Sequence, residues 1–165
     1  MLKKVLVTGL VVAGLTTSAM ASTDFIVRAG GGSTSISGGN SSGTADIQAG
    51  WEFNNAVNGS GAYGAFLFGY SVGKVDNKKL DHMQVQYNFG YTFKQNYTPY
   101  VLFGLGTTSD VYASGSYYFG GGFKYSITKH IGAEVEYKKI KSLDNTDTTT
   151  EPDASNVSGY VSYTF

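Results

Sequence analysis

The chain of 165 residues contains no cysteine, two prolines and no excess of charge of either sign. The absence of cysteine excludes the small disulfide-stapled scaffolds of exported proteins. Twelve basic residues face twelve acidic ones, so the excess of Lys and Arg that nucleic-acid binding requires is missing. The chain is instead rich in glycine (23 residues), tyrosine (13) and phenylalanine (10). That composition is typical of neither a disordered tract nor a helical bundle.

The first 21 residues predict an export signal. Two lysines in "MLKK" precede an apolar run from Val5 to Leu15, and the small-residue exit "AMA" follows at 19–21. This order is that of a secretory signal peptide cleaved before Ser22. A membrane-spanning anchor is the alternative, but it needs about 20 apolar residues. Residues 22–165 then form one domain, which is slightly acidic because the two leader lysines are lost.

Two-residue alternation of apolar and polar side chains recurs along residues 22–165, and no sustained helical period interrupts it. In "HMQVQYNFGYTF", Met83, Val85 and Tyr87 share one face while the glutamines between them share the other. The last ten residues, "NVSGYVSYTF", alternate in the same way. The pattern predicts eight strands, at about 24–33, 45–53, 62–73, 82–93, 99–106, 115–127, 131–141 and 154–165.

The short connections between these strands predict a register, because directly opposed residues of an antiparallel pair point to the same face. Around "TKH", Lys124 is expected opposite Glu134. Around "KQNYT", Phe89 is expected opposite Phe103. The wider connection "NNAVNGSG" leaves its register open. With these phases, all ten phenylalanines and Trp51 fall on the apolar face.

Two architectures compete for that apolar face. In a soluble lipocalin-like barrel or sandwich it packs inward, whereas in an outer-membrane barrel it meets lipid and encloses a polar lumen. The interior of an eight-stranded barrel is only just wide enough for side chains to fill, so it does not have room for so many aromatic rings. The sequence therefore favours an all-β, eight-stranded antiparallel up-and-down transmembrane β-barrel. Its shorter connections are expected in the periplasm and its longer polar loops outside the cell.

Three stretches, "YTPYVLFGLG", "YFGGGFKYSITKHIGAEVEYKKI" and "GYVSYTF", resemble the small OmpA-like and opacity-type outer-membrane β-barrels. The resemblance covers essentially all of residues 22–165. It implies a place in the outer membrane of a Gram-negative cell envelope. It also implies that Val161, Tyr163 and Phe165 are read as a signal by the outer-membrane assembly machinery.

Charged residues on the polar face are expected inside the barrel: Arg28, Asp46, Glu52, Lys124, Glu134, Glu136 and Lys138. Enclosed charges must pair, so we expect a salt-bridge network that plugs the lumen, with Lys124 beside Glu134 and Arg28 within reach of Glu52. The alternative is a selective pore or a ligand site. A belt of aromatic residues is expected at the periplasmic interface: Trp51, Phe53, Tyr91, Phe93 and Tyr125, together with Tyr63, Tyr97, Tyr100, Tyr163 and Phe165.

The sequence offers little for catalysis. His82 with Asp81 or Ser109 is the one pairing suited to it, and no motif supports this pairing. We therefore expect no enzyme activity, no cofactor and no metal site. His130 is expected to cap its turn.

The expected role is structural or adhesive. It would be carried out by a monomer whose surface-exposed loops meet a host or surface ligand. Lys139 is expected to point outward toward lipopolysaccharide phosphate. The alternatives are a narrow porin-like channel and a soluble periplasmic ligand-binding barrel.

Overall fold

The computed structural model describes residues 23–36, 41–57, 59–75, 78–79, 81–108, 115–143 and 154–165. Within these ranges, no helix is long and apolar enough to cross a membrane. The described residues form nine strands: β1 (Thr23–Ile36), β2 (Ser41–Val57), β3 (Ser60–Val75), β4 (Lys78–Lys79), β5 (His82–Thr92), β6 (Tyr97–Thr108), β7 (Ser116–Ser126), β8 (Ile131–Ser142) and β9 (Ala154–Thr164).

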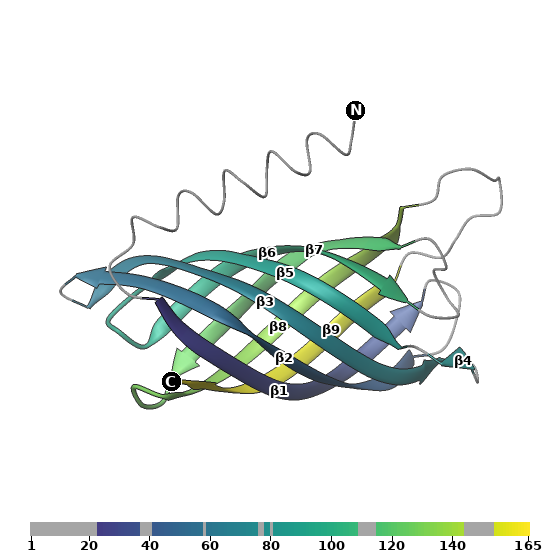
Figure 1. The fold of residues 1–165 in the computed structure, drawn as a ribbon, viewed down its shortest axis with the longest axis horizontal. Helices are drawn as coiled ribbons and strands as arrows, with labels where there is room; N and C mark the ends of the chain where they lie inside the picture. The colour runs from purple at the N-terminus through teal and green to yellow at the C-terminus, as the bar shows by residue number, and fades with distance from the viewer. Residues whose placement is uncertain are drawn as a thin grey trace.

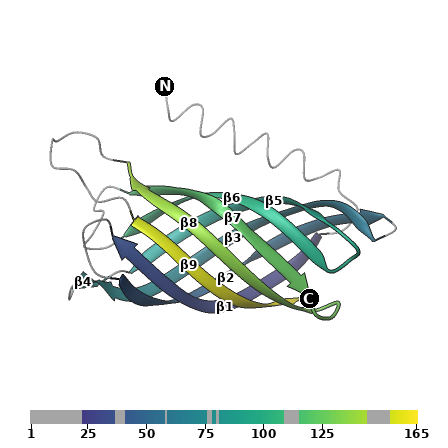
Figure 2. The ribbon, with the colours of Figure 1, turned by 180° about the vertical axis from the view of Figure 1, so that it is seen from behind.

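Eight of these strands close into an antiparallel barrel, and β4 is a two-residue addition that pairs with the end of β3. Each barrel strand pairs with its neighbours along the chain, and β9 returns to pair with β1 from Ile26↔Thr164 to Ile36↔Ala154 (Figures 1 and 2). The backbone N–H of Phe165 donates to the carbonyl of Phe25 at 2.9 Å. Closure leaves no open sheet edge, which hydrocarbon could not satisfy.

The apolar face of the sheet points outward. In β9, Val161 is 64% exposed, whereas Ser162 beside it is 1% exposed. Eight of the ten phenylalanines are 38–66% exposed, and Phe53 and Phe66 are half-buried on the same outer face. The soluble-barrel alternative is therefore wrong, because it requires these rings inside.

The height of the apolar exterior fits a bilayer. The outward residues of β5 begin at Met83, and the series ends at Phe93, just beyond the strand. These ten steps span about 33 Å at about 3.3 Å per residue. With strands tilted about 40°, they cover about 25 Å of membrane thickness, which is the height of the apolar band in outer-membrane barrels.

One predicted register is right and the other is wrong by two residues. Lys124 lies opposite Glu134, as expected. Phe89, however, lies opposite Val101 and not Phe103, because the β5–β6 connection is tighter than "KQNYT" suggests. The amide of residue 93 donates to the carbonyl of residue 97 at 2.7 Å, and two consecutive residues, 94 and 95, take positive φ angles of 49° and 67°. A shift of two preserves the face of every side chain.

The β2–β3 hairpin is longer than predicted. Its pairing continues through Asn55↔Ala62 to Val57↔Ser60, and the hairpin projects beyond the other connections at the end where the C-terminus lies (Figures 1 and 2). The amide of Gln95 donates to the carbonyl of Gly59 at 2.6 Å and braces it. Hydropathy does not indicate this extension, because backbone hydrogen bonding continues where apolar burial has stopped.

Several sequence-based predictions concern segments outside the described residues. The proposed signal peptide at 1–21 is one of them. Parts of all four predicted outer loops also lie outside the described residues: 37–40, 76–77 with 80, 109–114 and 144–153.

Candidate functional site in the barrel lumen

All seven charged residues expected in the lumen lie inside the barrel, and each is 1–8% exposed. Alternation places them there: Glu134, Glu136 and Lys138 are successive inward residues of β8. The same alternation points Asp46 and Glu52 inward from β2 and Arg28 inward from β1.

Arg28 is the centre of this network. Its Nη1 lies 2.6 Å from Oε2 of Glu134 and 2.7 Å from Oε1 of Glu136. On its other side, Nη2 donates to Oε1 of Gln48 at 2.8 Å. The Tyr100 hydroxyl on β6 donates to Glu136 at 2.9 Å. The layer thus joins strands from opposite sides of the barrel, and Arg28 is 1% exposed.

Two expected ion pairs are exchanged in the structure. Lys124 contacts Glu52, and Glu52 also accepts a hydrogen bond from the Thr164 hydroxyl at 3.2 Å. Arg28 contacts Glu134 instead of Glu52. Neighbours on adjacent strands are therefore not the ion-pair partners, because long side chains in a narrow closed lumen reach strands that the register does not place beside them.

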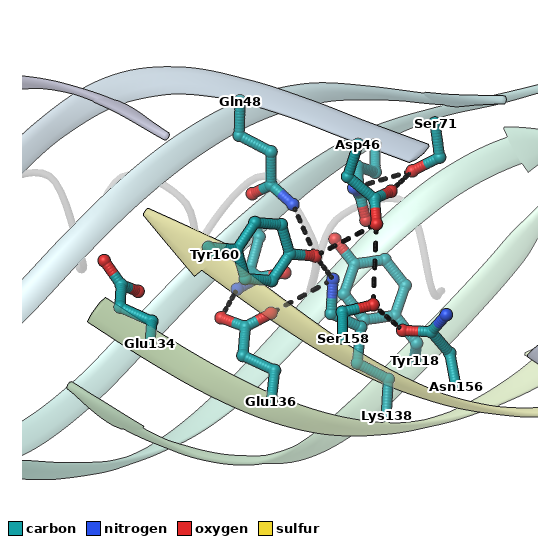
Figure 3. A network of polar contacts seen from close by, with 12 residues as sticks. Asp46, Gln48, Ser71, Tyr118, Glu134, Glu136, Lys138, Asn156, Ser158 and Tyr160 are labelled. Atoms are coloured by element: carbon teal, nitrogen blue, oxygen red, sulfur yellow. Dashed lines mark hydrogen bonds and ion pairs between the residues drawn. The ribbon is translucent and has the colours of Figure 1, made fainter. Parts of the chain in front are cut away.

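The network continues toward the end of the barrel that carries β4, and Figure 3 shows its contacts. Lys138 Nζ lies 3.1 Å from Glu136 Oε2 and donates to the Tyr160 hydroxyl at 3.3 Å. The Tyr160 hydroxyl in turn donates to Oδ2 of Asp46 at 3.4 Å. From Glu134 through Arg28, Glu136 and Lys138, the charges alternate in sign.

Tyr63 and Tyr100 correct the predicted belt, because both lie inside the barrel, at 4% and 5% exposure. Inward glycines make room for such rings. A Cβ added at Gly122 would lie 2.5 Å from Cζ of Tyr100, and one at Gly104 would lie 2.1 Å from Cζ of Tyr118. Inward glycine opposite tyrosine is the sequence signal that could have located these rings.

A second group that the sequence reasoning missed is apolar. Ile26, Leu67 and Leu102 point inward and are 0–3% exposed. Together with the lumen tyrosines they form a buried cluster, against which Ile140 packs. Each of the three lies between two outward apolar residues, so the apolar–polar alternation does not show that it points inward.

The other belt residues lie on the outer face: Trp51, Tyr91, Phe93, Tyr97 and Tyr125 are 38–47% exposed, and Phe53 is half-buried. The three residues of the proposed assembly signal, Val161, Tyr163 and Phe165, also point outward and are 46–66% exposed. The Phe165 ring lies 5.8 Å from that of Phe25, which lies 6.0 Å from Trp51.

His130 differs from its predicted role, whereas His82 lies in the lumen, on the polar face where alternation places it. His130 does not cap its turn with its ring; the Thr128 hydroxyl accepts its backbone N–H at 3.2 Å. The His130 ring instead places Nδ1 2.8 Å from the carbonyl of Thr164 and stacks on Tyr163 at 5.8 Å. His82 points into the lumen, with its ring 6.1 Å from that of Tyr118.

The remaining site predictions are placed as follows. Ser109 lies outside the described residues. The described part of the chain contains no group of three or more His, Cys, Asp or Glu suited to a metal ion. Lys139 faces outward, because it lies opposite the exposed Phe119.

Comparisons with known proteins agree with this geometry. The family model described as "Outer membrane protein beta-barrel domain" matches residues 7–165, and no curated protein matches. Neisserial surface protein A is 16% identical, with a TM-score of 0.64, covering 89% of this chain and 99% of its own. A de novo designed transmembrane β-barrel is 18% identical, with a TM-score of 0.54 and coverages of 86% and 95%. The outer membrane protein Ail of Yersinia pestis is 14% identical, with a TM-score of 0.50, and the match covers 87% of this chain and 100% of Ail. At these identities the likeness is one of fold.

Proposed function

The chain belongs to the outer-membrane protein β-barrel family, and from that premise we propose that it serves the outer membrane as a plugged barrel with a structural and surface-interactive role. Its apolar exterior supports residence in the bilayer, and its closed hydrogen-bonded sheet supports mechanical integrity. We expect a monomer, because one copy already satisfies every strand edge of the barrel.

The observation that carries the plug is the Arg28 layer. Arg28, Glu136 and Tyr100 come from β1, β8 and β6, and they meet inside the lumen with exposures of 1–5%. Gln86 of β5 adds a hydrogen bond to Glu136 at 2.9 Å. A hydrated ion can pass such a layer only if several charge-assisted contacts break together, because each buried partner left behind is costly.

Planar-bilayer conductance tests the plug. Refolded protein, verified by its heat-dependent mobility on a gel, is expected to produce no conductance steps under conditions in which a porin control does. The alternative function, a narrow channel for ions or small solutes, predicts reproducible steps. Reproducible conductance steps would contradict the plugged barrel and support the channel.

The surface role rests on the strands that continue into polar connections at the end opposite the C-terminus. We propose that these loops contact a host or surface ligand and that Lys139 contacts lipopolysaccharide. Replacing 144–153 with a Gly/Ser segment of equal length should reduce adhesion of expressing cells without changing the amount of barrel in the outer-membrane fraction. Unchanged adhesion for this and the matching replacement of 109–114 would contradict the adhesive role.

Export and insertion complete the proposal. By the family resemblance, Val161, Tyr163 and Phe165 serve as the signal for the outer-membrane assembly machinery. Deleting Phe165 should lower the folded fraction in cells, while the purified variant still folds in detergent. Equal amounts of folded variant and wild type in cells would contradict that role. We assign no catalysis to His82, because its ring faces the Tyr118 ring inside the lumen.

A further inference from the structure

The lumen holds one carboxylate that lies outside the ion pairs. Among the described buried charges there are four acids and three bases, which leaves one negative charge in excess. Each of the three bases contacts at least one glutamate, whereas Asp46 has no cationic group within ion-pair distance in the described part of the chain. Asp46 is 8% exposed. An enclosed charge without a counter-charge is strongly unfavourable.

Three hydroxyl groups contact this carboxylate (Figure 3). The Ser71 hydroxyl of β3 contacts Oδ1. From β9, the hydroxyls of Ser158 and Tyr160 lie 3.5 Å and 3.4 Å from Oδ2. The amide oxygen of Asn156 lies 2.6 Å from the Ser158 hydroxyl. Hydroxyl groups of β3 and β9 thus contact both oxygens of a carboxylate on β2. Gln84 donates to the Ser71 hydroxyl at 3.3 Å, and Lys138 donates to the Tyr160 hydroxyl at 3.3 Å.

The spacing of these oxygens suits a hard cation. Ligands that bind at about 2.4 Å and subtend a right angle lie about 3.4 Å apart. The two separations from Oδ2 match that value, and both are long for hydrogen bonds between oxygen atoms. Oxygen donors without Cys or His favour alkali and alkaline-earth ions over transition metals.

We infer that Asp46, Ser71, Ser158 and Tyr160 bind one alkali cation, Na⁺ or K⁺, in the half of the lumen toward β4. A monovalent ion matches the single excess charge and the single carboxylate, whereas Ca²⁺ sites combine several carboxylates with other oxygen ligands. Lys138 does not replace the ion, because it contacts Glu136 at 3.1 Å and reaches Asp46 only through the Tyr160 hydroxyl. The site goes beyond the proposed function and does not require the lumen to conduct.

The first test uses the wild-type protein in vesicles. Unfolding by urea is compared in NaCl, KCl and N-methylglucamine chloride at equal ionic strength. If the Kd of the site for its ion is about 10 mM, 100 mM of that ion should lower the unfolding equilibrium constant about tenfold. The organic cation is too large for the site and should give no such gain. Equal stability in all three salts would overturn the site, and the difference between NaCl and KCl identifies the preferred ion.

The second test locates the ion. If the salt comparison shows a preference for K⁺, crystals grown with rubidium chloride should show an anomalous peak in contact with Asp46 and Tyr160. If it shows a preference for Na⁺, crystals grown in NaCl should show a density peak about 2.4 Å from both side chains. Asp46→Asn, which keeps the shape of the side chain, should lose both the peak and the salt preference. The matched control is Asp24→Asn, which removes one acid at the opposite end of the barrel and should keep both. No peak in the wild type, or a peak that survives in Asp46→Asn, would overturn the assignment. If Asp46→Asn does not fold, the wild-type peak and salt comparison decide the matter.

Discussion

Replacing Arg28 with methionine tests the lumen network at its centre. The side chain keeps a similar length but loses its charge, so Glu134 and Glu136 are left beside each other. Lys138, 3.1 Å from Glu136, is then the base that remains closest to them. The hydroxyl of Tyr100, 3.2 Å from Glu134 and 2.9 Å from Glu136, becomes their main neutral donor.

The expected loss follows from burial. Removing one partner of a buried ion pair costs about 3–5 kcal/mol. The side chains of Arg28, Glu134 and Glu136 are 0–1% exposed, so water does not screen the charges left behind. Because Arg28 serves two carboxylates, we expect about 4–5 kcal/mol for Arg28→Met. Combining it with Glu134→Gln should recover part of the loss, because the excess charge falls.

Lys124→Met is the matched control. Lys124 serves the single carboxylate of Glu52, and the two side chains are 7% and 10% exposed, so we expect about 3 kcal/mol, the lower end of the range. Urea unfolding in vesicles, followed by the emission of Trp51, the single tryptophan, measures both variants. A loss below about 1 kcal/mol for Arg28→Met, the size of an exposed pair, would refute the reasoning.

Three further variants probe other contacts. Gly122→Val should cost about 1–3 kcal/mol in the same titration by crowding the Tyr100 ring; wild-type stability would show that the ring moves freely. His130→Ala removes the ring contacts that hold the end of β9, so stability should fall by about 1 kcal/mol; no change would mean that the contacts are incidental. Lys139→Leu should weaken retention of lipopolysaccharide by the purified barrel, and unchanged retention would refute the proposed phosphate contact.

The strand pattern could be predicted because it depends on a local property, the alternation of each strand between two environments. The predicted register between β5 and β6 was wrong by two residues, but an even shift leaves each side chain on its predicted face. The position at which the β2–β3 hairpin turns could not be predicted in this way, because the polar strand residues there resemble turn residues.

The interior was harder to predict. Tyr63 and Tyr100 fit an interfacial belt and a polar lumen equally, since tyrosine joins an apolar ring to a polar tip. The ion pairs depend on which side chains meet across the closed barrel. Lys124 reaches Glu52 from a strand far away in the sequence, and adjacent-strand register carries no information about such a contact.

The direction of Trp51 tests the central claim that the apolar face meets lipid. Trp51 is 44% exposed on the outer face, beside the Phe25 ring. In vesicles containing lipids brominated along the acyl chains, its emission should be blue-shifted and strongly quenched, while aqueous iodide should quench it little. Emission typical of water, quenched by iodide and unaffected by bromine, would contradict the account.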